Sequence, residues 1–161
     1  MRVGLALMVF GGGLAQTTVA PVLTVGSVTP DVVLVLIVLL GLRKGPEVGC
    51  LAGFVAGLLQ DVTGGGFVGA QALTKSLVGF VVGLLGTRLW VSSPLIQVPG
   101  LVLLSLAEGV ARWGLLQLFH FPASLSGLML HVILPQALYN GFVGSAVVLA
   151  FAWLEARRSS P

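Results

Sequence analysis

The fold is decided by residues 29–46, which read TPDVVLVLIVLLGLRKGP. The run from Val32 to Leu42 is apolar throughout and contains no charge. We expect Thr29 to be the N-cap of a helix, with Pro30 at the first helical position and Asp31 in the positive first turn. The stretch therefore predicts an apolar helix with a defined start.

The same stretch predicts where this helix ends. Arg43 and Lys44 place cations in the last turn, near the negative end of the helix dipole. Gly45 can adopt the left-handed conformation of a C-cap, and Pro46 suits the first position of a following helix. We therefore expect two helices joined by a tight basic turn.

The rest of the 161-residue chain has the same apolar character. Hydrophobic residues make up 57% and charged residues 8%, with a mean hydropathy of +1.09, whereas soluble domains average about 25% charged residues. At roughly 20 residues per span, six apolar segments fill the chain and leave no room for a soluble catalytic domain. We therefore expect an all-α, polytopic membrane protein that forms a single membrane domain. Its predicted spans are residues 3–23, 30–42, 46–62, 67–89, 97–119 and 125–154.

Turn residues separate these segments. Thr63-Gly64-Gly65-Gly66 predicts a tight connection, and Pro94 and Pro99 are expected to break the chain before the fifth segment. Pro135 lies inside the long last segment, where we expect a kink or an interfacial lead-in. The N-terminus resembles a secretory signal, but its apolar stretch is longer than a usual signal core, so we interpret it as the first span.

The second and third segments are short for a hydrocarbon layer about 30 Å thick. They could form a re-entrant pair. This would bring Arg43 and Lys44 into the membrane interior, where each charge costs about 3 kcal/mol on insertion scales. Local thinning of the bilayer is cheaper. We therefore favour six full spans.

The basic residues predict an orientation. If all six segments span, then Arg2, the Arg43-Lys44 turn, Arg88 and the Arg157-Arg158 tail lie on one side of the membrane. The connections on the other side contain no Lys or Arg. The positive-inside rule then places both termini in the cytoplasm, and the expected location is the cytoplasmic membrane.

Small residues recur at helical spacing in the third and fourth segments. Gly49, Gly53 and Gly57 share one helix face, and Gly79 and Gly83 begin a second stripe. Such faces allow close helix packing in membranes. They are candidate packing surfaces, including for helices of a partner.

Ionisable residues within apolar segments are candidate functional groups, because such charges are rare and face a bundle interior or a cavity. Glu108 and Arg112 are four residues apart on one helix and are expected to pair, or else to face another chain or a polar pocket. Lys75 is expected to reach back toward Asp61 or Gln60 as a structural tie. These five residues are the candidate intramembrane polar or partner-binding positions.

No catalytic, cofactor-binding or metal site is predicted. Cys50 is the single cysteine, and neither His120 nor His131 has an acid or a cysteine at ligand spacing. The Ser and Thr residues lack His and carboxylate neighbours that the sequence could bring together. The chain is therefore expected not to be an enzyme, and its few cations do not form a nucleic-acid footprint.

Several motifs together resemble the rod shape-determining protein MreD family. They are Pro30-Asp31 with the apolar run to Leu36, Leu42-Arg43-Lys44-Gly45, and Gly53 to Val62 ending in Leu-Gln-Asp-Val, followed by Gly65, Gly69, Ala70, Ala72-Leu73, Lys75 and Leu77 to Phe80. The C-terminal half resembles the family only in hydropathy and in its basic tail.

The resemblance implies a non-enzymatic scaffold subunit of the bacterial cell-elongation complex. Family members associate with MreC, a bitopic membrane protein, and act near a RodA-type glycosyltransferase, a class B penicillin-binding protein and MreB filaments in peptidoglycan synthesis. The family fold is similar to the S components of energy-coupling factor transporters. The alternative is therefore a substrate-binding S component of a vitamin transporter, for which Gln60, Asp61, Gln71, Lys75 and Asn140 could line a pocket.

Overall fold

The protein folds into helices joined by short turns. The computed structural model describes residues 10–14, 16, 18, 22, 24, 28–65, 67–88, 94–120 and 124–158. The order of elements is α2 (Val32–Lys44), α3 (Pro46–Gly64), α4 (Ala70–Arg88), α5 (Pro94–Leu118), α6 (Leu125–Leu128), the π-helical segment η1 (Met129–Ile133) and α7 (Leu134–Arg158). These described elements contain no β-strand, which confirms the predicted all-α class.

The helices lie close to the predicted segments from the second onward. Helix α2 occupies 32–44 where 30–42 was expected, and α3 occupies 46–64 where 46–62 was expected. Of the predicted first span, 3–23, only residues 10–14, 16, 18 and 22 are described, with residues 10–14 helical, and the remainder lies outside the described residues.

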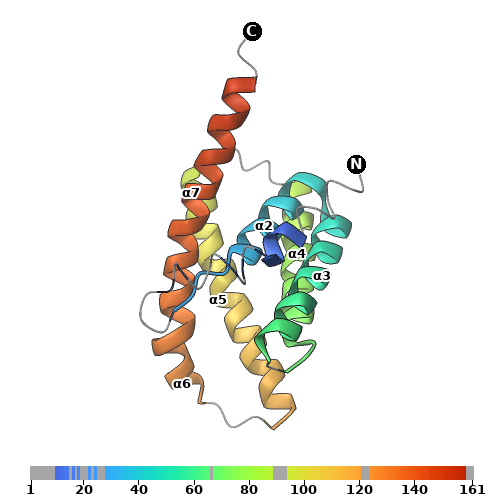
Figure 1. Ribbon diagram of the computed structural model, residues 1–161, viewed down its shortest axis with the longest axis vertical. Coiled ribbons are helices and arrows are strands. Elements are labelled where there is room, and N and C mark those ends of the chain that lie inside the picture. Colours follow the sequence, from blue (N-terminus) through green and yellow to red (C-terminus); the bar gives the residue numbers. More distant parts are fainter. Residues whose placement is uncertain are drawn as a thin grey trace.

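The helices form two groups. Helices α2, α3 and α4 pack against one another, with the most extensive contact between α3 and α4, and α5 packs along α7 (Figure 1). We call these the α2–α4 group and the α5–α7 group. The contacts between the groups, mainly α4 with α5 and α2 with α7, are less extensive.

Two apolar clusters hold this arrangement. One joins both groups through Leu34, Val35, Val38, Val78, Val82 and Leu101. The other lies within the α2–α4 group and contains Val33, Ile37, Ala52 and Ala56. The apolar run of residues 32–42 thus supplies both clusters from opposite sides of α2.

The start of α2 differs from the prediction. Its N-cap is Asp31, whose carboxylate accepts a 2.9 Å hydrogen bond from the Leu34 N–H, so the predicted N-cap Thr29 was wrong. Asp is as good an N-cap as Ser and better than Thr, and Pro30 then sits one position before the cap. Helix α2 ends at the expected residues, and Pro46 starts α3 as predicted, but Gly45 has φ 91° and ψ 178°, so it does not adopt the left-handed helical conformation that was expected.

Pro99 and Pro135 affect their helices in different ways. Pro99 lies inside α5 and does not break it, which contradicts the prediction that the helix begins after it. Since Pro94 starts the helix, Pro99 lies within its second turn and removes only one backbone hydrogen bond. Pro135 follows the π-helical segment η1, where the Leu134 N–H bonds to Met129 O. The helix is thus π-helical just before Pro135, and the expected kink or interfacial lead-in stays a prediction.

One helix among the described residues is long and apolar enough to cross a membrane. It is Val98–Leu118, while Ala70–Gly86 is apolar but shorter. Large apolar side chains nevertheless remain exposed on most helices, among them Leu51, Leu58 and Val62 on α3, Leu77 and Leu84 on α4, and Leu138 and Phe142 on α7. Such an apolar exterior is compatible with a lipid environment.

Candidate functional site: a buried ion triad

Lys75 is the most completely buried charged residue among those described, with a side chain that is 0% exposed. Its ammonium group lies 2.7 Å from Asp31 Oδ2 and 3.3 Å from Glu108 Oε1. It also donates a 3.1 Å hydrogen bond to Gln71 Oε1 one turn earlier on α4. A buried ammonium needs such partners, because an unpaired charge in an apolar interior is strongly unfavourable.

We call Asp31, Lys75 and Glu108 the ion triad. Its members come from three places: the residue before α2, the second turn of α4 and the middle of α5. Both acids are nearly inaccessible, at 4% and 3% exposure. The triad therefore links the α2–α4 group to the α5–α7 group through ionic contacts inside the bundle.

Neutral polar groups complete the coordination of the two acids. Gln60 Nε2 donates to Asp31 Oδ1 at 3.2 Å, and the Thr74 hydroxyl donates to Glu108 Oε1 at 3.3 Å. The other end of the Gln60 amide, Oε1, is buried and has no hydrogen-bond partner within the part of the chain that the structure describes. The network is thus one hydrogen bond short at Gln60.

The backbone at the start of α2 is held by side chains from distant segments. Asn140 on α7 accepts from the Asp31 N–H at 2.7 Å and donates to the Ser105 hydroxyl at 2.8 Å. Gln136 donates to Thr29 O at 3.0 Å. Gln16 bonds to both Pro30 O and the Val32 N–H. These contacts fix the position of the Asp31 carboxylate.

Asp61 has a different role from the one expected. Its carboxylate accepts backbone hydrogen bonds from Gly69, Gln71 and Ala72, at 2.8 to 3.1 Å, and so caps the start of α4. The predicted tie between Lys75 and Asp61 is therefore wrong, because the ammonium group bonds to Asp31 and Glu108 instead. Backbone N–H groups at a helix start are a favourable site for a carboxylate.

The predicted pair of Glu108 and Arg112 is also not the arrangement found. Glu108 accepts from Lys75 and Thr74 on the neighbouring helix. Arg112, one turn further along α5, is partly exposed. An acid facing the bundle interior finds a better partner across the interface than on its own helix, where the Arg side chain can extend outward.

The predicted glycine stripes lie against each other between α3 and α4. A Cβ atom added to Gly49 would overlap the Gly79 carbonyl, one at Gly53 would overlap the Lys75 carbonyl, and one at Gly57 would come within 2.7 Å of Ala72. Gly83 packs in the same way against Pro46. These glycines serve close packing within the chain, so they do not offer a surface to a partner helix.

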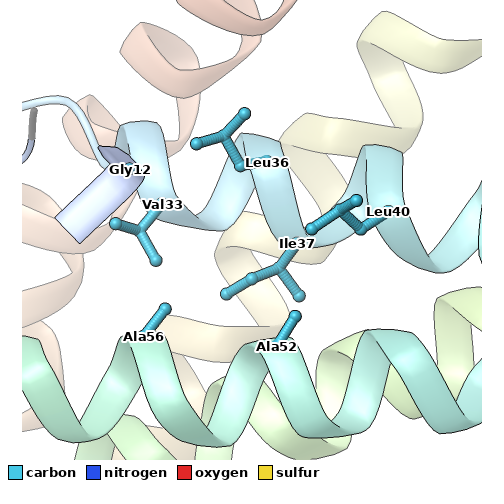
Figure 2. Close-up of a pocket in the computed structure, with 7 residues that line it drawn as sticks. All are labelled: Gly12, Val33, Leu36, Ile37, Leu40, Ala52 and Ala56. Atoms are coloured by element: carbon cyan, nitrogen blue, oxygen red, sulfur yellow. The ribbon is translucent and has the colours of Figure 1, made fainter. Parts of the chain in front are cut away.

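A shallow hollow lies between α2 and α3. Figure 2 shows its lining residues, with Gly12 at one end, Val33, Leu36, Ile37 and Leu40 from α2, and Ala52 and Ala56 from α3. The space in it that a water-sized molecule could occupy is about 10 Å³, far below the roughly 300 Å³ at which small-molecule sites begin, and such sites contain convergent polar groups that this lining lacks.

No group of three or more His, Cys, Asp and Glu side chains suited to a metal ion occurs among the described residues. The ion triad contains two acids, but their shared space is occupied by the Lys75 ammonium group. The polar network is therefore an ion-pair site in this structure.

The all-helical fold with a buried charged network and exposed apolar side chains is compatible with a membrane protein, and comparison with known proteins identifies the family. The family model described as rod shape-determining protein MreD matches residues 2–156, nearly the whole chain, and the chain belongs to that family of bacterial membrane proteins. The searches of curated proteins and of solved structures found no match. The family assignment made from the motifs is thereby confirmed.

Some of the motif residues that suggested the family take part in this network, whereas other members, including Glu108, lie outside those motifs. Asp31, Gln60, Asp61 and Lys75 all belong to those motifs, and each makes a buried polar contact described above. Sequence reasoning missed Asp31 as an ionic partner, because a favourable charge in the positive first turn of a helix already accounted for its position. The signal was the buried cation, Lys75, which required an acid from outside its own helix.

Proposed function

We propose that the protein is a non-enzymatic scaffold subunit of the bacterial cell-elongation complex. In this role it binds an MreC-like bitopic membrane protein and helps to position or regulate peptidoglycan synthesis for rod shape. A RodA-type glycosyltransferase, a class B penicillin-binding protein and MreB filaments would be close neighbours. The observation that carries the proposal is the family match over residues 2–156.

The proposal includes a topology of six spans with both termini in the cytoplasm, in a fold similar to the S components of vitamin transporters. The distribution of Lys and Arg supports it, because Arg2, Arg43, Lys44, Arg88, Arg157 and Arg158 fall on one side under this count. Helix α5 supports at least one span, since 25 residues extend about 37 Å at 1.5 Å per residue.

The surfaces left for partners are the exposed apolar faces. With the glycine stripes enclosed between α3 and α4, partner helices would contact side chains such as Leu58 and Val62 on α3, or Leu138 and Phe142 on α7. The five candidate polar residues, Gln60, Asp61, Lys75, Glu108 and Arg112, would then act by shaping the bundle that presents these faces.

Affinity purification from bacterial membranes tests the proposal. A tagged chain should recover an MreC-like single-span protein, and an unrelated polytopic protein with the same tag serves as control. Recovery of an ATPase pair together with a bound vitamin, without the single-span protein, would instead support a vitamin-transporter S component and overturn the scaffold role.

A further inference from the structure

The ion triad joins two helix groups that are internally well packed. Within the α2–α4 group, the backbone of Lys75 lies against Gly53 on α3 so closely that no Cβ atom fits between them. The side chain of the same residue extends to Glu108 in the other group. Lys75 therefore belongs rigidly to one group, in which it pairs with Asp31, while its ammonium group also binds Glu108 of the other group.

The boundary between the groups is the weaker part of the bundle. Contacts of α4 with α5 and of α2 with α7 and α5 are less extensive than those of α3 with α4 or of α5 with α7, and Figure 1 shows α5 and α7 lying to one side of the other three helices. A rigid-body movement would therefore occur along this boundary, as in other shear and hinge motions of packed helices.

The energetics of the triad suit a contact that can open. Apolar residues of the same volume usually stabilise a fold as well as a buried ion group does, so stability alone does not account for three buried charges. This reduces the free-energy difference between the closed arrangement and an open one.

We propose that the ion triad is a reversible lock between the α2–α4 group and the α5–α7 group. When the Lys75 contact to Glu108 breaks, the groups move apart along their boundary, while the Lys75 contact to Asp31 stays within the α2–α4 group and each group keeps its internal packing. The lock is a conformational device of the chain itself and does not depend on which partner the protein binds.

Distance measurements between spin labels test this directly in the full chain in lipid nanodiscs. In a Cys50→Ser background, Val62→Cys on α3 is labelled together with Leu138→Cys on α7, a pair that reports across the boundary. The matched control combines Val62→Cys with Leu84→Cys on α4, a pair inside one group. All three labelled positions are exposed, so labels do not disturb the core.

The lock predicts that Lys75→Met adds a population in which the Val62–Leu138 distance is longer by about 5 Å, the scale of one helical turn. The Val62–Leu84 distribution should stay unchanged. Unchanged distributions for both pairs would overturn the proposal, and so would a change in both, because the α2–α4 group would then have lost its own packing.

A second variant keeps the test decisive if Lys75→Met does not fold. The triple variant Asp31→Asn, Lys75→Met and Glu108→Gln leaves no unpaired buried charge and removes the ionic contacts. It should show the same longer Val62–Leu138 population with an unchanged control distance. A triple variant with the distances of the parent chain would overturn the lock.

Discussion

At the scale of single residues, Gln60 and Asp61 on α3 show that the direction of a side chain determines which groups it contacts. Gln60 and Asp61 are adjacent, but a helix turns about 100° per residue, so their side chains point to different surroundings. Gln60 donates to the Asp31 carboxylate, while Asp61 accepts from the backbone at the start of α4. Spacing along the chain could not distinguish these partners, which is why Lys75 was assigned to the wrong acid.

We expect Lys75→Met to destabilise the protein by about 3–5 kcal/mol, the usual cost of leaving buried charges unpaired. Asp31→Asn combined with Lys75→Met should cost clearly less than the sum of the single variants, since each single change removes the same contact. Denaturant titration in detergent measures this. Glu47→Gln, at an exposed position on α3, is the control and should add independently to Lys75→Met.

Asp61→Ala should lower stability by about 1–2 kcal/mol, the cost of losing a helix cap, because three backbone N–H groups lose their acceptor. Asp61→Asn retains one acceptor oxygen and should be milder. The same titration compares them. If Asp61→Asn were strongly coupled to Lys75→Met, an ionic contact between the two residues would have to exist after all.

At the scale of helices, the sequence predicted the parts that local chemistry controls. Charged and turn residues predicted the α2–α3 junction at Gly45 and Pro46, and the glycine spacing predicted one stripe of small residues on α3 and another on α4. It did not reveal that the stripes face each other, because which helix packs on which depends on the antiparallel pairing of α3 with α4. The expectation that these glycines hold partner helices failed for that reason.

Gly53→Ala should destabilise the chain by about 1–3 kcal/mol, the range for overpacking a close contact, because its methyl group would overlap the Lys75 backbone. Gly114→Ala on α5 is the matched control, since nothing lies within 4 Å of a Cβ there, and it should be neutral or stabilising by up to about 1 kcal/mol. Thermal unfolding in detergent separates them. Equal melting temperatures would show that α3 and α4 do not pack through Gly53.

At the scale of the whole molecule, the C-terminal end of α7 indicates which side of the bundle is the predicted cytoplasmic side. Its C-terminal part extends past the ends of α2, α3 and α4 (Figure 1). There Arg157 lies 3.6 Å from the centre of the Trp153 ring. Trp and Arg are typical of membrane interfaces, where the ring sits at the headgroups and the cation faces water. This end of the molecule and the Arg43-Lys44 turn should therefore lie on the same side.

Cysteine accessibility in intact cells tests that topology. In a Cys50→Ser background, Gly64→Cys, at an exposed position with free space around it, should react with a membrane-impermeant maleimide added outside. Lys44→Cys, exposed at the C-terminal end of α2, should react only after the membrane is permeabilised, because six spans place the basic turn in the cytoplasm. If α2 and α3 formed a re-entrant pair, position 44 would lie in the hydrocarbon layer and remain unlabelled in both conditions. Labelling of Lys44→Cys in intact cells would reverse the orientation, because it would place the basic turn outside.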